Sequence, residues 1–244
     1  MSLDFDGSND VLDLGNPSVL DITGTTLTLA CWFKHDTAAR NDMLIAKWGS
    51  VSLFQYRLWI SSADQITVSA GNGAGTQQGI SATTVISTAT WYHACGRLSS
   101  SGAGGLHVFT NGTDENNTTG ISMGSNGVNV GIGKALSGSA FPMDGKIAEA
   151  CIWNVALTDE QIRSLSRGVS PFQVRPSGLK YYCPLWSSAH IRDISSSAIL
   201  GTLTEAVTAA HAPVAPLVSV PQTSPYRVTV SAAGRRKLML GGVS

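Results

Sequence analysis

One strand followed by one capped helix constrains the fold of this chain more than any other segment. Residues 146–154 place apolar side chains as a β-strand requires, with a single change of phase near Cys151. Thr158 and Gln161 then have the spacing of a capping box, which begins a helix, and Gly168 is placed to end it. Because the rest of the chain carries mainly strand and turn patterns, this segment predicts an all-β fold with one short helix.

Charged residues are scarce, and their balance excludes some partners. Lys, Arg, Asp and Glu make up 13% of the 244 residues, against ~25% in typical soluble domains. Few Lys and Glu, together with many β-formers and glycine turns, favour strands over helices. The formal net charge is zero, so the chain has no global attraction to nucleic acid or to an anionic membrane. We therefore expect neither as a partner.

The chain shows no transmembrane or secretion pattern. It has no run of about 18 apolar residues, and its first residues lack the basic and apolar parts of a signal peptide. We therefore expect synthesis in a reducing cytoplasm, where thiols stay free. The cysteines lie in strand-like runs without metal-ligand spacing, which predicts buried thiols, with a disulfide pair as the alternative. They are Cys31, Cys95, Cys151 and Cys183.

Short apolar-alternating runs separated by glycine-rich turns are typical of a β-sandwich or jelly roll. Breaks such as residues 71–75 and 100–105 read as loops, and residues 106–112 read as part of successive hairpins. The strands we predict are residues 3–6, 11–14, 26–35, 43–48, 52–61, 65–70, 78–83, 91–98, 106–110, 129–132, 146–154 and 180–185.

The composition changes near residue 203, which predicts two parts. Residues 1–203 would form the sandwich domain, and residues 204–244 a proline-rich, extended C-terminal arm. Residues 211–225 hold four of the nine prolines, which exclude a helix or a central strand there. A disordered linker is the alternative. Near the end, a basic and then an apolar cluster are the predicted partner-binding residues: Arg235, Arg236, Lys237, Leu238, Met239 and Leu240.

Six motifs, in order, resemble the laminin-G-like (LamG) jelly rolls of the concanavalin A type. They occupy residues 3–12, 27–34, 91–97, 108–112, 145–162 and 181–186, so the resemblance covers residues 3 to 186. It implies an all-β, two-sheet antiparallel jelly-roll sandwich with one short helix, to which the extended C-terminal arm is added.

A narrower resemblance suggests a biological context. Residues 170–179, followed by His211-Ala212-Pro213, are similar to laminin-G-like proteins encoded among bacteriophage and prophage virion genes. This resemblance implies a non-enzymatic structural or decoration subunit of a phage capsid or tail, made in the host cytoplasm and located in the virion. Its partners would be other virion proteins or copies of itself, as in a homo-oligomer or symmetric assembly, bound through the arm.

The concanavalin A fold also hosts glycoside hydrolases, in which paired acidic residues carry out catalysis. A retaining hydrolase needs two carboxylates roughly 5–5.5 Å apart on one strand face. Asp114 and Glu115 are adjacent, so their side chains would point to opposite faces, and turn-forming asparagines surround them. Asp144 and Glu149 are separated by a turn. His93 is expected to be a packed structural histidine, and we predict no enzymatic activity.

Calcium is the one ion that the resemblance makes worth considering, although no cofactor is required. Members of this superfamily hold Ca²⁺ at the sandwich rim through aspartate and carbonyl oxygens. Asp6, Asp10 and Asp144 match the corresponding motif carboxylates here. The alternative is that Asp6 and Asp10 shape a tight turn by hydrogen-bonding to the backbone.

The alternative function is a carbohydrate-binding, lectin-like module that adheres to host or environmental glycans. Trp48, Phe54, Tyr56 and Trp59 alternate along adjacent predicted strands, so some of their rings could face a sugar. Tyr56 and Trp59 are the predicted glycan-binding residues. Trp and Tyr side chains at strand spacing usually belong to the core, and that interpretation stays open here.

Overall fold

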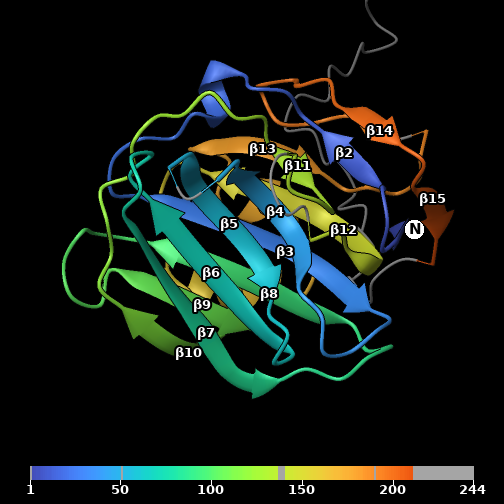
Figure 1. The fold of residues 1–244 in the computed structure, drawn as a ribbon, viewed down its shortest axis with the longest axis horizontal. Coiled ribbons are helices and arrows are strands. Elements are labelled where there is room, and N and C mark those ends of the chain that lie inside the picture. Colours follow the sequence, from blue (N-terminus) through green and yellow to red (C-terminus); the bar gives the residue numbers. More distant parts are fainter. Residues whose placement is uncertain (1, 51, 137–140, 190, 211–244) are drawn as a thin grey trace, which may run out of the picture. The chain divides into compact units, whose positions relative to one another are not determined.

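The computed structural model describes residues 2–50, 52–136, 141–189 and 191–210, and these form two antiparallel sheets packed face to face (Figure 1). The eight-stranded sheet runs in the order β10 (Thr113–Thr118), β9 (Leu106–Thr110), β8 (Tyr92–Leu98), β3 (Leu27–His35), β12 (Asp144–Trp153), β1 (Ser2–Asp6) and β15 (Val207–Ala209), with β13 (Leu179–Cys183) also pairing with β12. The seven-stranded sheet runs in the order β14 (Thr202–Thr204), β2 (Val11–Asp13), β11 (Gly131–Ile132), β4 (Asp42–Trp48), β5 (Phe54–Ile60), β6 (Gln65–Gly71) and β7 (Gln77–Val85). The predicted all-β, two-sheet sandwich is confirmed.

The core lies between the two sheets, where every second side chain of each strand points inward. Phe33 of β3, Leu58 of β5 and Val68 of β6 are almost fully buried in it. Burying each such side chain contributes about 1.5–3 kcal/mol. Gly96 of β8 faces Val68 so closely that a Cβ would lie 2.3 Å from a valine methyl, so only glycine lets the sheets approach there.

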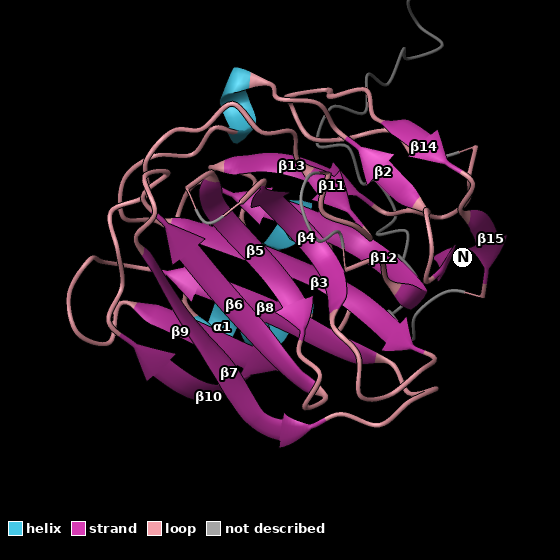
Figure 2. Ribbon diagram, viewed as in Figure 1, coloured by secondary structure: helices cyan, strands magenta, loops and turns pink. Residues whose placement is uncertain are grey.

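Helix α1 (Asp159–Leu165) begins and ends as its sequence predicts. The side-chain oxygen of Thr158 accepts from the Gln161 amide nitrogen, and Gln161 Oε1 accepts from the Thr158 amide nitrogen at 2.9 Å. Gly168, with φ 82°, donates its N–H to the Leu165 carbonyl. The buried Ile162 packs in a second apolar cluster on the outer face of the eight-stranded sheet, behind which Figure 2 shows α1.

The predicted change of phase near Cys151 is a β-bulge. The pairing of β12 with β3 shifts register between Ala148 and Cys151, and Glu149 in between has φ 53°. The Glu149 carboxylate accepts a hydrogen bond from the Tyr182 hydroxyl at 2.5 Å. The extra residue of the bulge shifts the alternation of side chains along β12. Apolar residues before and after the bulge therefore both point into the core.

Several features were not predicted, among them the short 3-10 helix η1 (Ser18–Leu20) and strand β14. Strand β10 occupies a segment that the sequence analysis regarded as turn-forming, and a four-residue helix, α2 (Pro171–Val174), follows α1. Residues 204–210, placed by the sequence analysis in the arm, contain β15, which pairs with β1 through Leu3 and Thr208. The rest of the predicted arm lies outside the described residues, including Arg235, Arg236, Lys237, Leu238, Met239 and Leu240.

The four cysteines are buried and free, as the sequence analysis predicted. Burial raises the pKa of each thiol; for Cys183 it reaches about 11. They are therefore uncharged at neutral pH and pack as small apolar side chains. No helix among the described residues is long and apolar enough to cross a membrane.

Candidate functional site

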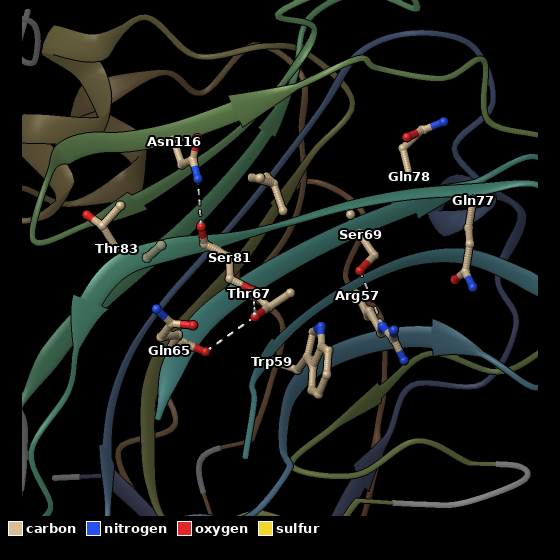
Figure 3. A pocket seen from close by; sticks show the side chains of 13 residues that line it. Arg57, Trp59, Gln65, Thr67, Ser69, Gln77, Gln78, Ser81, Thr83 and Asn116 are labelled. Carbon is tan, nitrogen blue, oxygen red and sulfur yellow. Dashed lines mark hydrogen bonds between the residues drawn. The ribbon is translucent and has the colours of Figure 1, made fainter. Parts of the chain in front are cut away.

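A hollow of about 680 Å³ lies on the outer face of the seven-stranded sheet, over β5, β6 and β7 (Figure 3). Its walls are mainly hydroxyl and amide side chains from β6 and β7. Arg57 and Trp59 come from β5, and Asn116 reaches in from β10 of the other sheet. The hollow thus combines one cation and one indole ring with neutral hydrogen-bonding groups, and we refer to it as the β5–β7 pocket.

Strand alternation and register bring these side chains together. Leu58 points into the core, so its neighbours Arg57 and Trp59 point outward. Antiparallel pairing places Arg57 opposite Ser69, and Trp59 opposite Thr67. Directly opposed side chains on one face lie about 4.5–5.5 Å apart at Cβ. The pocket floor is therefore a set of cross-strand pairs rather than a loop.

Hydrogen bonds orient the polar floor of the pocket. The hydroxyls of Thr67 and Ser81 are 2.9 Å apart, and the Thr67 hydroxyl donates to the Gln65 carbonyl at 3.3 Å. Asn116 Nδ2 donates to the Ser81 carbonyl at 3.3 Å, which links β10 to β7 (Figure 3). These bonds hold the floor in one arrangement before any ligand arrives, which lowers the entropy cost of binding.

Aromatic rings form one side of the site. The guanidinium carbon of Arg57 lies 4.8 Å from the ring centroid of Trp48 and 4.5 Å from that of Trp59. Phe141 stacks on both indoles, with ring centroids 5.6 and 6.3 Å away. Contacts of this kind are cation–π and stacking interactions, so the Arg57 side chain is held on a rigid apolar support.

Burial lowers the pKa of Arg57 to about 10. The guanidinium is therefore still protonated near pH 7, although it is partly removed from water. Burial has a larger effect on His93 of β8, whose pKa falls to about 3. Its ring is 2% exposed and packs edge-on against Trp32 at 5.5 Å. His93 is thus a neutral, packed side chain away from the pocket.

Of the two predicted glycan-binding residues, the structure brings only Trp59 to the pocket. Tyr56 is fully buried in the core, where its hydroxyl donates to the Leu20 carbonyl at 3.0 Å, so its ring cannot face a ligand. The prediction for Tyr56 is wrong because positions three apart on a strand point to opposite faces. Arg57 was not among the predicted residues, although the same alternation places it on the outward face beside Trp59.

The three aspartates of the predicted calcium site serve different partners. Asp10 Oδ2 accepts from the Asp6 amide at 2.8 Å, and Asp6 Oδ1 accepts from the Ser8 amide at 2.9 Å, which is the turn-shaping alternative. Burial raises the pKa of Asp10. Among the described residues, no three His, Cys, Asp or Glu side chains are placed to hold a metal. The residues present therefore do not fit a calcium ion.

The third aspartate, Asp144, faces a cation that belongs to the chain. Arg40 Nη1 lies 3.3 Å from Asp144 Oδ2, and Arg40 Nε lies 2.7 Å from Asp42 Oδ1. Arg40 Nη2 donates to the carbonyls of Gly7 and Pro142 at 3.2 and 2.7 Å. The guanidinium thus occupies a set of carboxylate and carbonyl oxygens, the ligand type that calcium prefers.

The adjacent acidic residues of β10 do not act as a pair. Asp114 Oδ2 lies 2.8 Å from His107 Nδ1. Glu115 Oε2 accepts from the Thr83 hydroxyl and the Thr84 amide at 2.8 and 2.7 Å. These hydrogen bonds outweigh the effect of burial and lower the pKa of Glu115. The two carboxylates are thus engaged with different partners, as their adjacency predicted.

Comparison with known proteins identifies relatives of this chain. The family model Laminin_G_3, described as the concanavalin A-like lectin/glucanases superfamily, matches residues 6–163. No curated protein was found to match.

Several solved structures share the fold. A Bacteroides ovatus protein provisionally named a carbohydrate binding protein is 22% identical with a TM-score of 0.64, and the match covers 88% of this chain and 61% of that one. A CBM40 of the Ruminococcus gnavus IT-sialidase, solved with α2,3-sialyllactose, is 12% identical with a TM-score of 0.54, over 68% and 98%. A pentraxin from Limulus polyphemus is 17% identical with a TM-score of 0.51, over 84% and 95%. At these identities the likeness shows the fold alone.

Proposed function

The chain belongs to the Laminin_G_3 family of the concanavalin A-like lectin/glucanase superfamily, and from this premise we propose that it is a non-catalytic carbohydrate-binding module. Its binding site is the β5–β7 pocket. The observation that carries the proposal is the composition of that pocket, in which an outward tryptophan and arginine adjoin a floor of hydroxyl and amide groups.

Such a composition suits a sugar. A pyranose ring presents a flat, apolar C–H face, which an indole ring can cover, and an edge of hydroxyls, which need donors and acceptors. Trp59 supplies the ring, and on the same outward face the exposed Gln77, which pairs with Gly71, makes no side-chain hydrogen bond to another described residue. Its amide thus offers an NH2 donor group and a carbonyl acceptor in the pocket without loss of an existing bond.

The same pocket is poorly suited to hydrolysis. Glycosidases of the common kind need two carboxyl groups, separated by roughly 5–5.5 Å for retention or 6.5–9.5 Å for inversion. None of the 13 residues that line the pocket is an aspartate or glutamate. A bound glycan would therefore be held and not cleaved at this position.

The comparisons support this proposal over the interpretation as a virion subunit. The Bacteroides ovatus protein and the CBM40 share the fold and are named for carbohydrate binding. Attachment to a phage capsid or tail depended on the C-terminal arm, which lies outside the described residues. The virion role stays a prediction, and it is compatible with a subunit that also binds host glycans.

A glycan array tests the proposal with the full chain and two variants. Trp59→Ala removes the indole from the pocket, whereas Trp186→Ala removes an indole that is 40% exposed and does not line it. We expect binding by the wild type and by Trp186→Ala, and loss in Trp59→Ala with an unchanged circular dichroism spectrum. Absence of binding by the wild type to every glycan, or equal binding by all three proteins, would contradict the proposal.

A further inference from the structure

We propose, on the basis of the carbohydrate-binding function above, that the glycan carries an acidic sugar whose carboxylate pairs with Arg57. Arg57 is a partly buried arginine whose guanidinium lies against aromatic rings. Arg40 pairs with Asp42 and Asp144, and Arg97 pairs with Asp159 at 2.5 Å. Arg57 has no carboxylate partner among the described residues.

The geometry of Arg57 leaves its binding edge available. Its guanidinium lies against the rings of Trp48, Phe54 and Trp59, at 4.8, 5.2 and 4.5 Å. Nε points to the Ser69 hydroxyl at 3.5 Å, the limit of a hydrogen bond. The two terminal nitrogens make no hydrogen bond or ion pair with a described residue. A planar guanidinium held in this way presents two parallel donors, which match a carboxylate.

The described residues around Arg57 that line the pocket include no competing anion. The lining of the pocket holds no acidic side chain, so the positive charge of Arg57 is not compensated there. Glu115 of β10 is already engaged by Thr83 and Thr84 at the far edge of β7. Burial, which lowers the pKa of Arg57 to about 10, also strengthens its attraction to an incoming anion because less water screens the pair.

Arg57 and Trp59 can act on one sugar at the same time. They are outward neighbours on β5 and lie side by side in Figure 3. A uronic or sialic acid joins a carboxylate directly to its sugar ring, so the carboxylate can reach Arg57 while the ring covers Trp59. A neutral sugar would use the indole and the amides but would leave the guanidinium unpaired, at a cost in affinity.

Titration calorimetry tests this with ligand pairs that differ only in charge. The probes are sialyllactose against lactose, and oligogalacturonate against its fully methyl-esterified form, with a sulfated but carboxylate-free oligosaccharide as a third class. The proteins are the wild type, Arg57→Gln, Arg57→Lys and the control Arg192→Gln, which changes an exposed arginine outside the pocket.

We expect at least one acidic probe to bind about 10- to 100-fold more tightly than its neutral counterpart. Arg57→Gln should remove this difference, Arg57→Lys should retain part of it, and Arg192→Gln should retain all of it. The wild-type comparison of acidic and neutral probes depends on no variant, so it decides even if Arg57→Gln fails to fold.

The opposing results are distinguishable. Equal binding of the acidic and neutral members, unaffected by Arg57→Gln, overturns the acidic-sugar inference and leaves the carbohydrate-binding function standing. Binding of the sulfated probe alone overturns the assignment to a carboxylate. Binding of no probe here and of no glycan on the array overturns both proposals.

Discussion

The guanidinium carbon of Arg57 lies 4.5 Å from the centre of the Trp59 ring, and both side chains point outward from the same strand. This pair places a fixed charge directly beside an apolar surface. Each residue also supports the other, since the indole restricts the arginine and the arginine covers one part of the indole. A substitution at either position should therefore affect the binding surface of both.

The first prediction is a graded series at Trp59. Affinity for the bound glycan should fall in the order Trp, Phe, Ala, with Trp59→Phe several-fold weaker and Trp59→Ala at least tenfold weaker. A phenyl ring retains part of the stacking surface, whereas alanine removes it and frees Arg57, and aromatic pairs of this kind contribute about 0.5–1.5 kcal/mol beyond burial. Titration calorimetry measures the series. Equal affinities for Phe and Ala would argue against ring stacking.

The second prediction concerns Arg40. Arg40→Gln should lower the free energy of unfolding by about 3 kcal/mol, because removing one partner of a buried ion pair leaves the other charge uncompensated. Asp42 is fully buried and, among the described residues, would retain only His35 as an ion-pair partner, whose Nδ1 lies 3.8 Å away. Urea denaturation compares this variant with Arg167→Gln, which changes an exposed arginine and should cost under about 0.5 kcal/mol. Equal losses would mean that Arg40 is dispensable.

The third prediction concerns calcium. Because the Arg40 guanidinium already faces Asp144, adding millimolar Ca²⁺ or EDTA should leave the thermal unfolding temperature unchanged. An ion that bound only the folded state would raise that temperature with its concentration. A rise that saturates with Ca²⁺ and disappears in Asp144→Asn would show that the motif aspartates do hold a metal.

The fourth prediction follows from His93. Its pKa is about 3 in the folded protein and about 6.5 when unfolded, so the unfolded chain binds the extra proton first as the pH falls. The contribution of neutral His93 to the free energy of unfolding is complete above about pH 6.5, and it is lost as the pH falls towards 3. Between pH 7 and pH 5 the loss from this residue should be about 2 kcal/mol.

The variant His93→Phe checks this assignment. It retains a ring beside Trp32 but cannot take up a proton, so its free energy of unfolding should change less between pH 7 and pH 5. Its value at pH 7 serves as the control for any packing cost of the substitution. Parallel pH curves for wild type and variant would assign the acid sensitivity to other groups.

Local signals made much of the fold predictable. The capping of α1 depends on Thr158 and Gln161, which are three residues apart, and the bulge in β12 shows as a change of phase at Cys151. Strand β15 was missed because its partner is β1, at the opposite end of the chain. No local pattern states that Thr208 will lie opposite Leu3.

The pocket was less predictable because it depends on strand register. Trp59 was identified from its type, and its outward direction follows from alternation, which should also have excluded Tyr56. Its neighbours Thr67 and Ser69 belong to another strand, and only the register of β5 with β6 places them beside it. The contact of Arg40 with Asp144 joins positions 104 residues apart and has no signature in the sequence.

The most direct test of the central claim is an NMR titration that follows the indole N–H signals of the six tryptophans as the bound glycan is added. Only Trp59 lines the β5–β7 pocket, and Trp48 adjoins it through Arg57. We expect the signals of Trp59 and Trp48 to shift, while those of the buried Trp153 and the exposed Trp186 stay in place. Shifts at Trp186 or Trp153 with Trp59 unmoved would place the binding site elsewhere and contradict it.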